Sequence, residues 1–180
     1  LQEQPGNPDL VFERARLDVL RDSAASARPR ILALLRIKPG DEALQARAVE
    51  FFEAHHMNDA LEERLIAAAA KGGDEPLQAL ARFYFAQRRE NDAHSTLQRM
   101  IPRGGTTAEQ AAAHHRVAQA LRSQGDVAGA IESLRSAARL VPENREVHLL
   151  LGELENARGN ASAARAAFEI AFRSSRTEAE

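Results

Sequence analysis

Small residues recur along the chain at a spacing that predicts pairs of antiparallel helices. They stand twelve positions apart, and each heads a segment whose apolar residues follow helical spacing. The five pairs are Ala15 and Ala27, Ala48 and Ala60, Ala81 and Ala93, Ala118 and Ala130, and Gly152 and Ala164. Successive pairs are offset by 33, 33, 37 and 34 residues. Because small residues let two helix backbones approach where they cross, the pattern predicts five helical hairpins.

Turn residues fall where these hairpins need them. Gly125-Asp126 and Gly159-Asn160 lie between two helices, where a left-handed residue ends one helix and a capping residue begins the next. Thr107 with Gln110 predicts a capping box at the start of the fourth hairpin. Pro29 is expected to shorten the second helix of the first hairpin.

The turns divide the chain into a lead-in, one continuous array and a tail. The lead-in is residues 1–7 and the tail is residues 179–180. The array covers residues 8–178, with units at about 8–40, 41–73, 74–107, 108–144 and 145–178. This predicts a single all-α array of ten helices.

This arrangement resembles the tetratricopeptide repeat family, as found in bacterial proteins. The strongest similarity lies in the fourth unit. There the residues at the family's signature places are Val117, Ala118, Leu121, Gly125, Asp126, Ala130, Leu134, Ala137 and Pro142. The fifth and third units follow the pattern closely, and the first two are degenerate. The resemblance implies a right-handed superhelical solenoid.

In this family the first helices of the repeats line a concave groove that takes an extended peptide or a helix of a partner protein. The resemblance therefore implies a partner groove in this chain. Its residues would be Phe12, Arg16, Gln45, Val49, Phe52, Gln78, Arg82, Phe85, His115, Gln119, Arg122, Leu149 and Glu153. Phe52 and Phe85 suit core packing as well as groove exposure, and Phe12 suits either an end cap or an exposed place.

One subfamily clamps a carboxylate with a Lys and an Asn on one repeat's first helix. The Lys place here holds Phe12, Gln45, Gln78, His115 and Leu149. The Asn place holds Arg16, Val49, Arg82, Gln119 and Glu153. Since no repeat supplies either residue, this clamp is not expected.

The last predicted helix carries apolar residues where earlier units face a following repeat. Ile170 and Phe172 are the residues concerned. We expect Phe168 to point back into its own hairpin and Phe172 to face outward. Ile170 and Phe172 thus form a candidate end face for association with a second copy of the chain.

Composition and charge exclude several function classes. The formal net charge of −2 argues against a general nucleic-acid binder, which presents a basic surface. The sequence has no Cys, so disulfides and thiolate metal sites are excluded. No apolar stretch approaches the ~20 residues of a membrane span. These features suit the bacterial cytoplasm and the periplasm equally.

No residue pattern predicts catalysis, a cofactor or a metal. His55-His56 and His114-His115 are neighbours in sequence, and neighbours on a helix point about 100° apart and cannot chelate one ion. Asn58-Asp59 is interpreted as a helix cap, and Gly104-Gly105 belongs to an inter-repeat loop rather than a phosphate-binding loop.

The sequence therefore predicts a non-enzymatic scaffold or adaptor that binds a protein or peptide. By analogy with the family, it would belong to a larger bacterial assembly such as envelope or export machinery. The alternative is a structural protein that self-assembles through its array ends.

Overall fold

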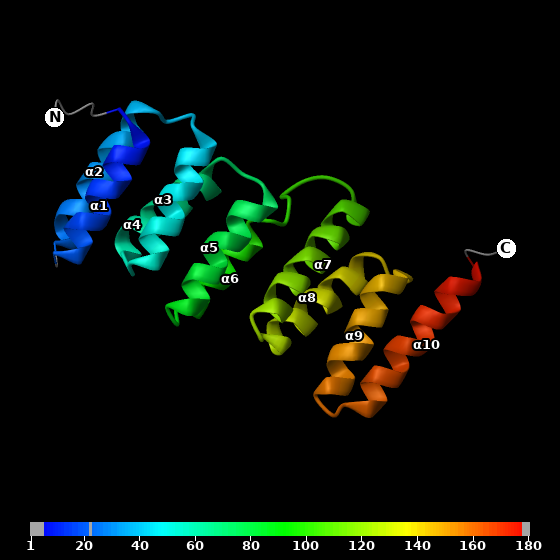
Figure 1. Ribbon diagram of the computed structural model, residues 1–180. Coiled ribbons are helices and arrows are strands. Elements are labelled where there is room, and N and C mark those ends of the chain that lie inside the picture. Colours follow the sequence, from blue (N-terminus) through cyan, green and yellow to red (C-terminus); the bar gives the residue numbers. More distant parts are fainter. Residues whose placement is uncertain (1–5, 22, 178–180) are drawn as a thin grey trace. The chain divides into compact units, whose positions relative to one another are not determined.

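The computed structural model describes residues 6–21 and 23–177, and the side chains of all of these except Ala24 and residues 175–177. Within these residues the chain forms ten α-helices and no strand, which confirms the all-α prediction (Figure 1). The helices are α1 (Pro8–Leu20), α2 (Ala24–Ile37), α3 (Glu42–Ala54), α4 (Asn58–Ala70), α5 (Asp74–Ala86), α6 (Glu90–Gln98), α7 (Thr107–Ser123), α8 (Val127–Leu140), α9 (Arg145–Ala157) and α10 (Ala161–Thr177). Most of the predicted lead-in and all of the predicted tail lie outside the described residues.

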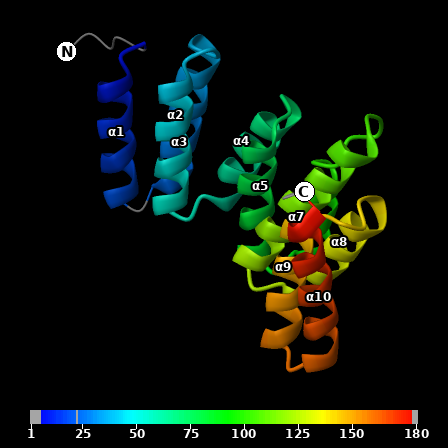
Figure 2. The same ribbon diagram turned by 90° about the vertical axis from the view of Figure 1, so that its right-hand side faces the viewer.

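Each odd-numbered helix packs against the helix that follows it, so the chain is a series of helical hairpins. The views in Figures 1 and 2 both show α9 and α10 side by side. The chain divides into two compact units, Leu1–Lys71 with α1 to α4 and Gly72–Glu180 with α5 to α10, here called unit 1 and unit 2. The division of the whole chain into one five-unit array stays a prediction.

The small residues that predicted the hairpins are buried. Eight of the ten, all except Gly152 and Ala164, are at most 1% exposed, and those two are buried as well. A Cβ atom on Gly152 would lie only 2.5 Å from Cε1 of Phe168, so the ring occupies the space that any side chain at this position would need. The spacing therefore identified ten buried small residues on the paired helices.

The core of unit 1 is built on phenylalanines. The ring of Phe51 lies edge-on to those of Phe12 and Phe52, with centroids 5.7 and 6.3 Å away. Arg47 covers the other side of Phe12, with its guanidinium carbon 4.4 Å from the ring centroid, and also pairs with Asp9 at 2.6 Å. Stacked and edge-on aromatic contacts of this kind add to the burial energy of the rings.

In unit 2 a buried carboxylate joins successive hairpins. Glu155 on α9 is only 1% exposed. Its Oε1 accepts a hydrogen bond from Nη2 of Arg135 on α8 at 2.7 Å, and its Oε2 accepts one from Nδ2 of Asn160 at 2.8 Å. One side chain therefore holds α8, α9 and the turn that leads into α10.

A buried histidine secures the same junction. His148 on α9 lies within 2.7 Å of the carbonyl oxygen of Pro142 through its Nε2, which therefore donates the hydrogen bond. Its Nδ1 is buried without a hydrogen-bond partner. The contact ties the first turn of α9 to the loop that follows α8.

Three local predictions differ from the structure. The capping box of α7 is formed by Thr106 and Glu109, one residue earlier than predicted, because these two exchange hydrogen bonds between side chain and backbone. Pro29 lies inside α2, which nevertheless runs for 14 residues, and Ala27 in the turn before it is fully buried. Asn58-Asp59 belongs to the first turn of α4, whose N-cap residue Met57 makes no side-chain cap bond.

Overpacking at a helix crossing should lower stability. We expect Ala130→Leu on α8 to decrease the free energy of unfolding by about 1–3 kcal/mol, because Ala130 is fully buried and the added methyl groups have no space. Urea unfolding followed by circular dichroism measures the change. The matched control is Ala128→Leu, at an exposed position of the same helix. Ala111 on α7 is only 1% exposed and cannot serve as the control. Equal midpoints for the two variants would contradict the assigned register.

Candidate binding groove

Two of the predicted groove residues of unit 1 lie in its core. Phe12 and Phe52 are 1% and 0% exposed, so their assignment to a groove is wrong. Both rings pack in the core, since burial of a phenylalanine is more favourable than leaving it in water. Arg16 pairs with Glu13 on its own helix, and Gln45 donates to the carbonyl of Pro39 at 2.5 Å.

Unit 2 brings three of the predicted residues together. Gln78, Arg82 and Phe85 lie on one side of α5 and line a hollow of about 280 Å³ between α5 and α7. The full lining is Glu75, Gln78, Ala81, Arg82, Phe85, Leu97, Ala120, Ser123 and Gln124. We call this hollow the α5–α7 groove.

Small residues and local hydrogen bonds shape the α5–α7 groove. Ala81 and Ala120 have short side chains, which leaves space between the two helices. On the α7 wall, Oγ of Ser123 donates to the carbonyl of Ala120 at 2.7 Å and accepts from Nε2 of Gln124 at 3.1 Å. Beside the groove, Nε of Arg116 on α7 bonds Oδ2 of Asp74 at 2.5 Å and ties α7 to the start of α5. The groove therefore results from the packing and the hydrogen bonds of α5 and α7.

The sequence left open whether Phe85 packs in the core or is exposed to the groove, and in the structure its ring does both in part. Its ring is half-buried and lines the α5–α7 groove, and it forms an edge-on contact with the ring of His94, with the two centroids 5.8 Å apart. His94 lies in α6, and its Nε2 is 2.8 Å from Oδ2 of Asp126, the N-cap residue of α8. This chain of contacts positions the Phe85 ring.

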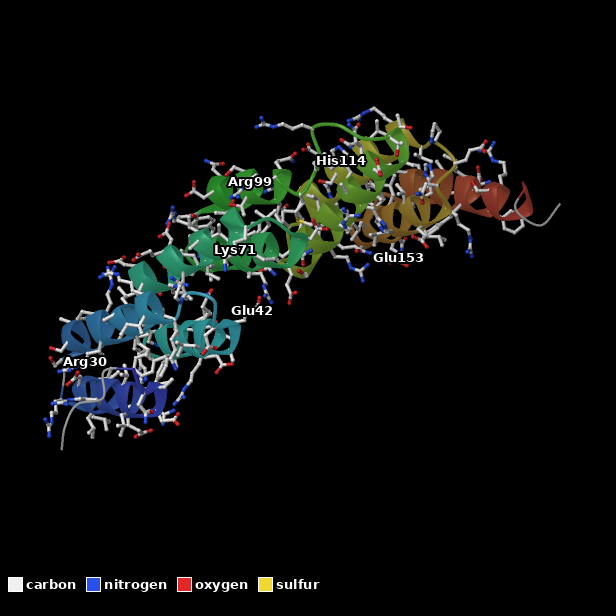
Figure 3. All side chains as sticks on the ribbon, turned by 90° about the horizontal axis from the view of Figure 1, so that it is seen from above. Arg30, Glu42, Lys71, Arg99, His114 and Glu153 are labelled. Atoms are coloured by element: carbon white, nitrogen blue, oxygen red, sulfur yellow. The ribbon has the colours of Figure 1, made fainter. Side chains whose placement is uncertain are left out.

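Four of the five remaining predicted groove residues of unit 2 form two side-chain pairs. Gln119 and His115 are one turn apart on α7, 3.5 Å from each other. Burial lowers the pKa of His115, while Glu146 raises it and Arg116 lowers it to smaller extents. Arg122 reaches Glu153 on α9 at 3.4 Å, and both side chains are more than half exposed (Glu153 is labelled in Figure 3). Leu149 is half-buried on α9.

A larger hollow lies on α10. It has a volume of about 770 Å³ and is lined by residues of α9 and α10. Phe168 and Phe172 both line it and are 38% and 67% exposed. Phe168 also rests against Gly152, as expected for a residue that points into its own hairpin. Ile170 is half-buried and is not among the residues that line this hollow, so an end face made of Ile170 and Phe172 stays a prediction.

Among the residues that the structure describes, no group of three or more His, Asp or Glu side chains is arranged to hold a metal ion. His55 and His56 border a third hollow in unit 1, and His56 has a positive φ of 54°.

Across the described ranges, no helix combines the length and the apolar character that crossing a membrane requires.

One comparison with known proteins finds a repeat in the last third of the chain. Residues 121–178 match the sequence model described as "Tetratricopeptide repeat". No curated protein shows a significant match. Among solved structures, a crystal structure of MamA aligns over 92% of this chain and 96% of its own, with 17% identity and a TM-score of 0.47.

Two further structures align at comparable levels. A MamA fragment from Desulfovibrio magneticus RS-1 covers all of both chains at 13% identity and a TM-score of 0.46. Pseudomonas aeruginosa PilF covers 93% of this chain and 76% of its own at 16% identity and a TM-score of 0.44. Residues 121–178, which hold the end of α7 and the helices α8 to α10, are therefore similar in sequence to the tetratricopeptide repeat.

Proposed function

We propose that this protein is a non-catalytic adaptor that holds an extended segment of a partner protein in the α5–α7 groove. The observation that carries the proposal is the meeting of Gln78, Arg82 and Phe85 around one hollow. Aromatic and Arg side chains are common anchors at protein interfaces, and the amide of Gln78 suits a peptide backbone. The partner would belong to a larger bacterial assembly, such as envelope or export machinery.

Charge reversal on this side of unit 2 tests the proposal. We expect Arg82→Glu combined with Arg122→Glu to raise the Kd for a partner with an acidic bound segment. The expected increase is about tenfold or more, because charged contacts are lost and repulsion replaces them. The Arg122 pair with Glu153 is exposed, so its loss should cost little stability. Calorimetric titration with the partner identified by affinity capture and mass spectrometry gives the change in Kd.

The control for this experiment is Arg103→Glu with Arg158→Glu. Both residues are exposed and lie outside the α5–α7 groove. The pair Arg135 and Arg139 is unsuitable, because Arg135 holds the buried Glu155. Equal losses from the two double variants would point to diffuse electrostatic attraction and would contradict a groove.

The hollow on α10 favours a second candidate function, association of two copies through this face. Its aromatic lining resembles the apolar patches that monomers rarely leave in contact with water. We expect Phe172→Glu to shift a concentration-dependent dimer toward monomer with little change in helicity, because this ring is 67% exposed. Phe168→Glu should instead disrupt the last hairpin, since its ring packs on Gly152. Sedimentation measures the first effect, and a monomer at high concentration of the unmodified chain would exclude this function.

A further inference from the structure

Two opposite charges face the α5–α7 groove without a partner. Arg82 and Glu75 both lie on α5, both line the groove and both are exposed. Neither forms an ion pair or a side-chain hydrogen bond with any other residue that the structure describes. Asp74, next to Glu75, is by contrast neutralised by Arg116. The groove therefore carries one unpaired cation and one unpaired anion.

The two charges are separated along the groove. They stand seven residues apart on one helix, which places them on the same side of α5, about 10 Å from each other along the helix axis. Gln78 lies between them in the sequence of α5, and Ala120 on α7, which is half-buried, also lines the groove. The order along α5 is thus anion, amide, cation, and the apolar side chain of Ala120 lines the same groove.

The size of the groove limits what can lie in it. At about 280 Å³ it is smaller than most small-molecule sites, and a helix with its side chains is about 10 Å wide. An extended peptide fits better, since it needs space only for one or two side chains. Such a chain advances about 3.3 Å per residue, so about three residues span the distance between Glu75 and Arg82.

We propose that the α5–α7 groove selects an extended peptide segment with an acidic and a basic residue two to four positions apart and a small apolar residue between them. The acidic residue pairs with Arg82, the basic residue pairs with Glu75, and the apolar side chain contacts Ala120. This inference rests on the proposed adaptor function and names the chemistry of its ligand. Two charges of opposite sign also set the direction in which the segment lies.

Selection from a displayed library of random ten-residue peptides tests this proposal. The immobilised full chain is compared with Arg82→Glu, with the charge-exchanged variant Glu75→Arg/Arg82→Glu, and with Arg103→Glu as the control. Circular dichroism confirms equal helicity. We expect the unmodified chain and the control to enrich the acidic–basic pair, and Arg82→Glu to reduce that enrichment about tenfold. The charge-exchanged variant should enrich the pair in the opposite order.

The other outcomes separate this inference from the adaptor function. Enriched peptides that depend on Arg82 but carry one charge or none would overturn the inference and leave the groove as a binding site. Peptides enriched equally by the unmodified chain and by Arg82→Glu, or no enrichment at all, would overturn both.

Discussion

Replacement of Phe52 by Ala is expected to lower the free energy of unfolding of unit 1 by about 3–5 kcal/mol, the range for truncation of a fully buried aromatic side chain. Phe52 is 0% exposed and its ring meets that of Phe51 edge-on. Removal of the ring leaves a cavity between α3 and its neighbours and also removes an aromatic contact. Hydrogen exchange should show the loss in the amides of α1 to α4, with unit 2 as an internal reference.

The control for this experiment is Phe85→Ala in unit 2. Phe85 is half-buried and borders the α5–α7 groove, so its truncation should cost clearly less stability. A loss for Phe52→Ala no larger than that for Phe85→Ala would mean that the Phe52 ring is not part of the core. Such a result would support the prediction from the sequence that Phe52 is a groove residue.

Arg135→Ala should destabilise the junction of α8 and α9 by about 3 kcal/mol. The substitution leaves the buried carboxylate of Glu155 with Asn160 as its remaining partner, and an uncompensated buried charge is costly. The Arg135 side chain is 54% exposed, so water can replace part of the lost interaction and the upper end of the usual range is not reached. Urea unfolding with hydrogen exchange of α8 and α9 measures the effect.

Two further variants complete this comparison. Arg139→Ala removes an exposed Arg of the same helix whose side chain donates a hydrogen bond to Ser136, and it should be nearly neutral. Glu155→Gln in the Arg135→Ala background should recover part of the stability, because a neutral amide is easier to bury than a charge. If Arg135→Ala and Arg139→Ala lose the same amount, the ion pair contributes nothing to the junction.

The hairpins were predictable because close helix contacts need small residues, and small residues are visible in the sequence at a constant spacing. The helix ends were predictable where glycine permits a left-handed backbone, as at Gly125 and Gly159, whose φ angles are 82° and 81°. The start of α7 was placed one residue late, because Thr106 and Thr107 are adjacent and each is followed three residues later by Glu or Gln.

The groove was predictable only in part, because it depends on two helices from different hairpins. The sequence identified Gln78, Arg82 and Phe85, which share one side of α5. It did not identify Ala120, Ser123 or Gln124, since the position of α7 beside α5 follows from the packing of the two helices. Assignment of groove residues by repeat position alone therefore included Phe12 and Phe52, which are buried in the core.

The buried carboxylate was missed although a signal for it exists. Glu155 follows His148 and Leu151 at positions i+7 and i+4, so it continues the apolar stripe of α9. A charged residue within such a stripe indicates either a buried ion pair or the edge of the packed surface. The sequence alone does not distinguish these, because the partner Arg135 belongs to the preceding hairpin.

The ion pair between Arg135 and Glu155 also determines how α9 is aligned along α8. Leu and Ala recur every three or four residues in these helices, so their apolar contacts would be similar if α9 slid by one helical turn, about 5.4 Å. After such a slip Leu151 or Gly159 would face Arg135, and the carboxylate of Glu155 would be buried away from the guanidinium. A shifted alignment is therefore penalised by an isolated charge, and one side chain distinguishes the native register from its nearest competitors.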